Sequence, residues 1–174
     1  MKRWVMGVVA GAALLACGAQ AAEVSIVALG ASNTFGSGRG RTAGGVPSSQ
    51  AYPAKLQALL QAKGLAAHVS NAGIPGDTTG GMLARLDSAV PSGTTIVILQ
   101  PGGNDMRRGQ GASRAGNIAE IKRRLSARHI MLGHLGQIAP KATREPDGQH
   151  FNAQGHAAFA AWLAPKVIAA AHAR

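Results

Sequence analysis

The sequence predicts a three-layer α/β domain with a mainly parallel β-sheet. Short apolar runs alternate along the chain with longer segments that carry apolar residues at helical spacing, and such alternation is typical of βαβ units. The clearest strand, residues 94–99, is β-branched and almost entirely apolar, as expected for a strand that is covered on both faces. Glycine-rich segments such as residues 36–45 mostly follow the predicted strands, which places candidate binding loops at the carboxyl edge of the sheet.

Four strands and four helices are expected in order along the chain. Tyr52-Pro53 begins a helix that Gly64 stops, because proline suits the first helical turn and glycine commonly follows helix ends. Ile118, Ile121 and Leu125 recur at helical spacing in a later helix. The predicted strands are residues 24–29, 67–71, 94–99 and 129–132, and the predicted helices are residues 52–60, 79–90, 117–128 and 153–171.

Residues 1–21 are expected to be a secretory signal peptide. Two basic residues and an apolar run precede a small-x-small cleavage site that ends at Ala21. Cleavage there leaves 174 − 21 = 153 residues, so residues 22–174 are expected to form one domain in the bacterial periplasm or medium. The alternative is a lipoprotein anchored through Cys17, because the preceding Leu-Leu-Ala resembles a lipobox.

The cysteine count, net charge and aromatic content limit the kinds of site and partner that are expected. Cys17 is the only cysteine, so the domain after the leader has none for a disulfide or a thiolate metal site. Its formal charge is +11 − 2 = +9, but the basic residues are scattered, with runs only at Arg107-Arg108 and Lys122-Arg123-Arg124. With one Tyr and three Phe to stack on bases, no nucleic-acid partner is expected. Membrane contact is expected only through a lipidated cysteine, and the chain is expected to be a monomer.

A nucleophile and a base are separated by more than a hundred residues. Ser32 follows the first predicted strand, and Asp147 and His150 lie near the end of the chain. A serine hydroxyl becomes a good nucleophile when an imidazole takes its proton and a carboxylate holds that imidazole in place. Gly73 and Asn104 lie just past two other predicted strands and are candidate oxyanion donors. Ser32, Gly73 and Asn104 could therefore meet at one edge of the sheet.

Structural roles compete with each of these interpretations. Ser32 could be a helix N-cap, the Asp147-Gly148 pair a turn, and His150 a cap of the last helix. His134 is a rival base because it also follows a predicted strand. A phosphate-binding loop at residues 30–38 is a further alternative, although this segment lacks the Gly-Lys-Ser/Thr ending of a P-loop. No pattern of metal ligands is present, and neither a metal nor an organic cofactor is expected.

Four segments together resemble the SGNH hydrolases, also called the GDSL lipase/esterase family. The segments are Gly30-Ala31-Ser32-Asn33-Thr34, Asn71-Ala72-Gly73, Gly102-Gly103-Asn104-Asp105 and Asp147-Gly148-Gln149-His150. The likeness is nearest to the small periplasmic group of thioesterase I, lysophospholipase L1 and arylesterase, whose members share the Tyr-Pro helix start and a Leu-Ala-Arg-Leu segment, here residues 83–86. The resemblance implies a flavodoxin-like α/β/α sandwich.

The resemblance also implies roles for the candidate residues. Ser32 would attack an ester or thioester carbonyl, His150 would transfer the proton, and Asp147 would orient His150. The N–H groups of Ser32 and Gly73 and the side-chain amide of Asn104 would bind the oxyanion. The expected function is hydrolysis of carboxylic esters or thioesters with short to medium acyl chains. The alternatives are a carbohydrate O-acetyl esterase, or a weakly catalytic exported protein that binds anionic glycan or lipid through its basic surface.

Three features depart from the family pattern. Ala31 stands where an aspartate usually precedes the nucleophile, so a polar contact beneath the nucleophile turn is expected to be absent. Gln100-Pro101 precedes the third segment, and a proline removes a hydrogen-bond donor where a strand ends. The stretch between Asp105 and Asp147 is short, which predicts a missing βα unit or binding loop and an open, shallow pocket.

Overall fold

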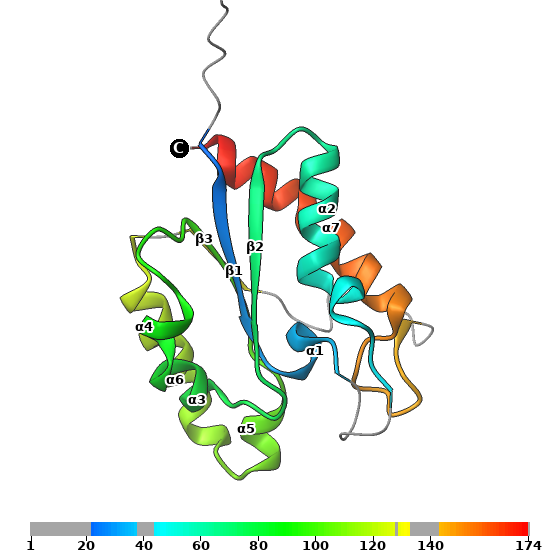
Figure 1. Ribbon diagram of the computed structural model, residues 1–174. Helices are drawn as coiled ribbons and strands as arrows, with labels where there is room; N and C mark the ends of the chain where they lie inside the picture. The colour runs from blue at the N-terminus through cyan, green and yellow to red at the C-terminus, as the bar shows by residue number, and fades with distance from the viewer. Residues whose placement is uncertain (1–21, 38–43, 128, 133–142, 174) are drawn as a thin grey trace, which may run out of the picture.

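Four parallel strands form the centre of the molecule in the computed structural model (Figure 1), which describes residues 22–37, 44–127, 129–132 and 143–173. The sheet has the order β2-β1-β3-β4, and all its pairings are parallel. The strands are β1 (Val24–Gly30), β2 (Ala67–Gly73), β3 (Ile96–Gln100) and β4 (His129–Leu132).

Helices cover both faces of the sheet and complete the predicted three layers (Figure 1). Helices α2 (Tyr52–Ala62) and α7 (Ala153–His172) pack together over one face. Helices α3 (Thr79–Ala84), α4 (Leu86–Ala89) and α6 (Gly111–Arg124) cover the other. The side chains of β1 and β3 contribute to both apolar clusters, which explains why these two strands read as continuous apolar runs.

Three short helices lie in the connecting segments. Helix α1 (Ser32–Phe35) follows β1, the 3₁₀ helix η1 (Ser48–Gln50) precedes α2, and α5 (Asn104–Arg107) follows β3. None of them was predicted, because three or four residues are too few for helical periodicity to show. Among the described residues, no helix is long and apolar enough to cross a membrane.

The predicted strands and helices are all present, with corrected bounds. The predicted helix at residues 79–90 is two helices, because the chain bends at Arg85, whose ψ of 13° ends α3. The helix predicted at residues 117–128 begins six positions earlier, at Gly111, and ends at Arg124. Its first turns contain glycine and serine, which have low helix propensity and hid this start from sequence patterns. The bounds of the predicted signal peptide lie outside the described residues.

The strand register aligns the carboxyl ends of three strands. Gly30 pairs with Gly73 on one side and with Gln100 on the other. Strands β1, β2 and β3 therefore end side by side at one edge of the sheet. Ser32 follows β1 at this edge, Gly73 is the last residue of β2, and Asn104 follows β3. Pro101 comes after the last ladder pair of β3, so its missing N–H removes no sheet hydrogen bond.

Gly73 has no side chain because helix α1 approaches its backbone. A Cβ atom at this position would lie 2.3 Å from the backbone nitrogen of Phe35 and 2.8 Å from the carbonyl carbon of Thr34. Backbone atoms cannot move away as a flexible side chain can, so any other residue would displace α1 from the end of β2. The close approach that this glycine permits is thus between two parts of the chain.

His156 joins the two helices on one face of the sheet. Its side chain is 1% exposed, and its Nδ1 accepts a hydrogen bond of 3.2 Å from the backbone N–H of Tyr52, in the first turn of α2. That N–H has no acceptor within its own helix. Burial, with a smaller effect from the positive charge of Lys55, lowers the pKa of His156 to about 4, so the folded protein holds this imidazole neutral.

We expect His156 to make the stability fall in acid. Between pH 6.5, the ordinary pKa of the side chain, and about pH 4, the unfolded chain binds a proton that the folded chain does not. The free energy of unfolding should therefore fall by up to about 3 kcal/mol from this group as the pH drops through that window. Urea unfolding at several pH values should show a shallower fall for His156→Gln than for the wild type. His68→Gln, which changes an exposed histidine, should retain the wild-type slope; equal slopes in all three proteins would contradict this account.

Candidate active site

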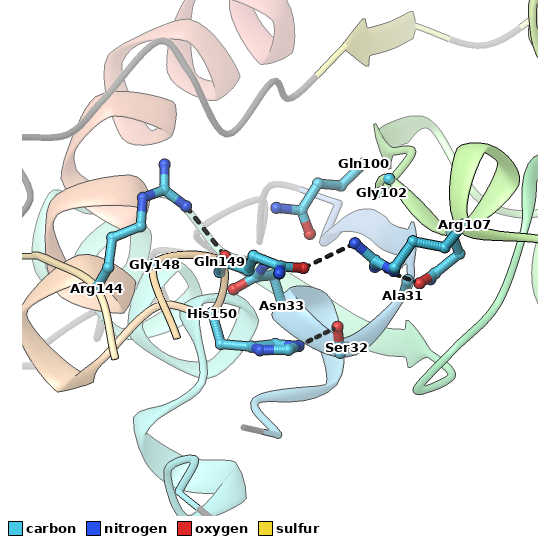
Figure 2. A pocket seen from close by; sticks show the side chains of 12 residues that line it. Ala31, Ser32, Asn33, Gln100, Gly102, Arg107, Arg144, Gly148, Gln149 and His150 are labelled. Carbon is cyan, nitrogen blue, oxygen red and sulfur yellow. Dashed lines mark hydrogen bonds between the residues drawn. The ribbon is translucent and has the colours of Figure 1, made fainter. Parts of the chain in front are cut away.

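Ser32 is the first residue of α1, and its hydroxyl faces an imidazole. The Oγ of Ser32 lies 2.9 Å from Nε2 of His150 (Figure 2). The N-cap position belongs to Ala31, and no side chain caps this helix. The interpretation of Ser32 as an N-cap is therefore wrong, and its side chain is directed to His150.

Asp147 holds the other side of the imidazole. Its Oδ2 lies 2.5 Å from Nδ1 of His150, and its Oδ1 accepts from the backbone N–H groups of Gln149 at 2.9 Å and His150 at 3.0 Å. Asp147 thus also forms the turn that its Asp-Gly sequence suggested, and Gly148 adopts a φ of +68° there. His150 is not a helix cap, because Asn152 caps α7 by accepting from the N–H of Gly155.

The charge state of Asp147 fixes the tautomer of His150. Desolvation would raise the pKa of Asp147, but the hydrogen bonds from His150 and Gln149, together with the charge of the imidazole, outweigh it and hold this pKa well below its ordinary value. An ionised carboxylate can only accept hydrogen bonds, so Nδ1 of His150 carries the proton. In the neutral ring, Nε2 is then free to accept the proton of the Ser32 hydroxyl.

Asn33 attaches the segment that carries His150 to helix α1. Its Oδ1 accepts from the N–H of Phe151 at 2.7 Å, and its Nδ2 donates to the carbonyl oxygen of Gln149 at 3.2 Å. One side chain, 8% exposed, thus bonds to the residues on both sides of His150. Because Asn33 is next to Ser32 in the chain, it fixes the positions of Ser32 and His150 relative to each other.

The two predicted oxyanion donors outside α1 differ in their contacts. Asn104 lines the cavity in front of Ser32, and its Nδ2 donates one hydrogen to the carbonyl oxygen of Asp77 at 2.6 Å, which leaves its second hydrogen available. Gly73 does not line that cavity, and its N–H donates to Oδ1 of Asn71 at 3.0 Å. An oxyanion could use the Gly73 N–H only by replacing this acceptor.

Two buried polar contacts hold the segments that carry Ser32 and Asn104. Beneath α1, Thr34 donates from Oγ1 to Oε1 of Gln100 at 2.6 Å, so a polar contact exists there although Ala31 replaces the aspartate. Asp105 is 1% exposed and accepts from both the N–H (3.1 Å) and the hydroxyl (2.5 Å) of Thr79, at the start of α3. The second contact fixes the chain directly after Asn104.

Arg85 connects the loops that carry the candidate site residues. Its Nη2 donates to the carbonyl oxygens of Gly30 at 3.2 Å and Ala72 at 2.9 Å, and it forms an ion pair of 2.8 Å with Asp77. In the sequence, the Leu-Ala-Arg-Leu segment stood out only because it resembles a segment of the SGNH hydrolases. The role of this arginine depends on contacts up to 55 positions away, which no local pattern records.

A cavity of about 350 Å³ opens in front of Ser32 and His150. Figure 2 shows Gln149 between Arg107 and Arg144, above Ser32 and His150, with Gln100 and Gly102 higher in the view. The lining residues are Ala31, Ser32, Asn33, Gln100, Gly102, Gly103, Asn104, Arg107, Arg144, Gly148, Gln149 and His150. Most of them come from the segments predicted to meet at this edge, while the two arginines were not predicted as site residues.

The remaining predictions concern other parts of the chain. His134, the rival base, lies outside the described residues. Within the parts of the chain that the structure describes, no group of three or more His, Cys, Asp and Glu residues could hold a metal ion. The basic run at the end of α6 is partly neutralised, because Arg123 and Arg124 pair with Glu120 at 2.7 Å and 2.9 Å.

The fold has several solved relatives. TesA aligns with a TM-score of 0.70 at 21% identity, over 84% of this chain and 99% of that one. A carbohydrate acetylesterase family member from Sinorhizobium meliloti aligns with a TM-score of 0.66 at 17% identity, over 84% and 98%. AlinE4, an SGNH-hydrolase family esterase, is 29% identical with a TM-score of 0.55, over 84% of this chain and 74% of its own. The predicted α/β class is confirmed.

Sequence comparison also finds an esterase named TesA. Esterase TesA of Pseudomonas aeruginosa is 34% identical over 94 residues, which cover 51% of this chain and 47% of the relative. The chain thus spans about half the length of this curated relative. Residues 28–166, which include the whole of the site described above, match the GDSL-like Lipase/Acylhydrolase family, and the chain belongs to this family.

Proposed function

We propose that the protein is a serine hydrolase that cleaves carboxylic esters or thioesters. The observation that carries the proposal is the continuous line of hydrogen-bonded groups from Oγ of Ser32 through both nitrogens of His150 to Asp147. This arrangement supplies a nucleophile, a base and a group that orients the base. Membership of a family of lipases and acylhydrolases supports the same chemistry.

The reaction would proceed by two acyl transfers. The Oγ of Ser32 attacks the carbonyl carbon while Nε2 of His150 takes the hydroxyl proton. The imidazolium formed is stabilised by Asp147 and then gives that proton to the leaving alcohol or thiol, which produces an acyl-enzyme. His150 next takes a proton from water, and the resulting attack releases the acid and restores Ser32.

The negative oxygen formed in each step needs donors already in position. The N–H of Ser32 is in the first turn of α1, where no acceptor within the helix exists, and the second amide hydrogen of Asn104 is available on the cavity wall. We assign these two as the principal donors. Gly73 would add a third once its bond to Asn71 is exchanged for one to the substrate.

The cavity suits a small acyl group. It is open, and its described lining residues are mostly polar residues and glycines, with no large apolar side chain among them, so we expect short to medium acyl chains to be preferred. A polar alcohol such as an acetylated sugar fits the same lining, and acetylated xylose is the substrate that would identify this second function.

Removal of either reacting group should abolish turnover. With p-nitrophenyl acetate, butyrate and octanoate as substrates, Ser32→Ala and His150→Ala should each lower kcat/KM by about three orders of magnitude or more. Asp147→Asn should also lower it strongly, because an amide can present a donor to Nδ1 and favour the wrong tautomer. Circular dichroism of each variant checks the fold. Equal rates for folded wild type and Ser32→Ala would refute the proposed nucleophile, and a rate that peaks with octanoate would refute the preference for shorter chains.

The proposed role of Asn33 can be separated from that of the reacting groups. Asn33→Ala removes two hydrogen bonds, each with a net worth of about 1 kcal/mol, that hold the residues on either side of His150. The variant should lose about tenfold or more in kcat with little change in KM, because it disturbs the base rather than substrate binding. The matched control is Gln61→Ala, which removes a side-chain amide that bonds to Ala67 far from the site. A loss of thermal stability equal in both variants, with kcat unchanged, would show that Asn33 is only structural.

We further infer that the chain is exported and loses residues 1–21. A basic start, an apolar stretch and a small-x-small site support this. Amino-terminal sequencing of the protein from the periplasmic fraction of an expressing bacterium should find Ala22 first. A start at a modified Cys17 would support the lipoprotein alternative instead, and an intact Met1 would contradict export by either route.

A further inference from the structure

A guanidinium group lies on the cavity wall between the oxyanion donor and the segment that carries the base. Arg107, the last residue of α5, donates from Nη2 to Oδ1 of Asn104 at 2.5 Å and from Nη1 to Oε1 of Gln149 at 2.7 Å (Figure 2). Both acceptors are neutral amides. The side chain is thus held in one position while its positive charge is left uncompensated by these contacts.

Within the described part of the chain, no acidic residue lines the cavity with Arg107. Arg144 lines the opposite side and donates to the carbonyl oxygen of Gln149 at 3.1 Å, while none of the twelve lining residues is Asp or Glu. Three described carboxylates near the site have partners other than Arg107. Asp77 pairs with Arg85, Asp147 bonds to His150, and Asp105 accepts from Thr79.

Arg107 differs from the arginines at the end of α6 in its partners. There, Arg123 and Arg124 share Glu120 on an exposed helix face, as is common for surface charges. The side chain of Arg107 is also exposed, but it forms no ion pair within the described part of the chain and lies at the wall of a cavity that contains the proposed nucleophile. A fixed cation of this kind raises the local concentration and the affinity of negatively charged molecules.

We propose that the site selects esters or thioesters whose alcohol or thiol part carries an anionic group, such as a carboxylate or a sulfonate, within reach of Arg107. The inference rests on the proposed function. The leaving group must face His150, which is to protonate it, and Gln149 next to His150 is the residue that Arg107 contacts. An anion on the leaving part therefore lies on the arginine side of the scissile bond.

Matched acetate esters test the charge preference. The substrates are 4-acetoxybenzoate and 4-acetoxybenzenesulfonate, which are anionic, and methyl 4-acetoxybenzoate, which is neutral. Dividing the kcat/KM for an anionic ester by that for the neutral one, and comparing this ratio between proteins, cancels the intrinsic reactivity of each ester. We expect Arg107→Gln to lower the ratio by about tenfold, a typical effect of one charged hydrogen bond.

Two controls isolate the charge. Arg108→Gln removes the neighbouring exposed arginine, which does not line the cavity, and should keep the wild-type ratio. Arg107→Lys should restore part of the preference, since it retains the charge without the two-point contact. Added sodium chloride should lower the wild-type ratio and leave that of Arg107→Gln almost unchanged, because salt screens charges near the surface.

The outcomes separate this inference from the proposed function. If the wild type hydrolyses the neutral ester and Arg107→Gln has the same ratio as the wild type, the charge preference is wrong while the hydrolase stands. If the folded wild type hydrolyses none of the three esters, the proposed function fails and this inference with it. If Arg107→Gln is inactive with every ester because Asn104 has moved, the affinity of Ser32→Ala for 4-acetoxybenzoate decides. That affinity should fall about tenfold when Arg107→Gln is added, and no change would overturn the inference.

Discussion

The ion pair and carbonyl contacts of Arg85 hold together three of the four segments that form the candidate site. One guanidinium bonds to the carbonyl oxygens of Gly30 and Ala72 and to the carboxylate of Asp77. Ser32 lies two residues after Gly30, and Gly73 directly follows Ala72. The backbone carbonyl oxygen of Asp77 accepts a hydrogen bond from the side chain of Asn104. Three segments that share no sequence neighbourhood are thereby held at fixed positions along the edge of the sheet. The sheet register brings them to one level, and this side chain fixes their separation.

His150, the proposed base, is positioned by other contacts. His150 belongs to no strand of the sheet and stands in the segment before α7, so neither the register nor Arg85 positions it. Asn33 does so, by bonding to the backbone on both sides of it, while Asp147 closes the turn and orients the ring. Helix α7 is itself tied to α2 by the buried contact between His156 and Tyr52. The distance between Ser32 and His150 therefore depends on packing across the face that α2 and α7 cover.

Much of this arrangement could be predicted from the sequence, because its strongest signals are local. Apolar runs predicted β1 and β3. The four short segments, taken together, predicted that Ser32, Asn104, Asp147 and His150 belong to one site. What could not be predicted depends on distant contacts. The bend at Arg85, the bonds of Asn33 across 116 and 118 positions and the place of Arg107 on the cavity wall leave no periodic trace in the sequence. Gly73 was expected from its segment, but the physical reason for it, the backbone of α1 against the end of β2, appears only in three dimensions.

The electrostatics of the site favour negative charge at two places through one side chain. Arg107 withdraws electron density from the amide of Asn104 by donating to its Oδ1, which makes the Nδ2 hydrogens stronger donors to a developing oxyanion. The same cation faces the proposed leaving-group side of the cavity. Among the described residues, the carboxylate in contact with His150 is that of Asp147. It does not line the cavity, and it accepts hydrogen bonds from the imidazole and from the backbone of its own turn. The proposed stabilisation of the transition state and the proposed selection of an anionic substrate thus share one side chain, so a substitution of Arg107 is expected to weaken both.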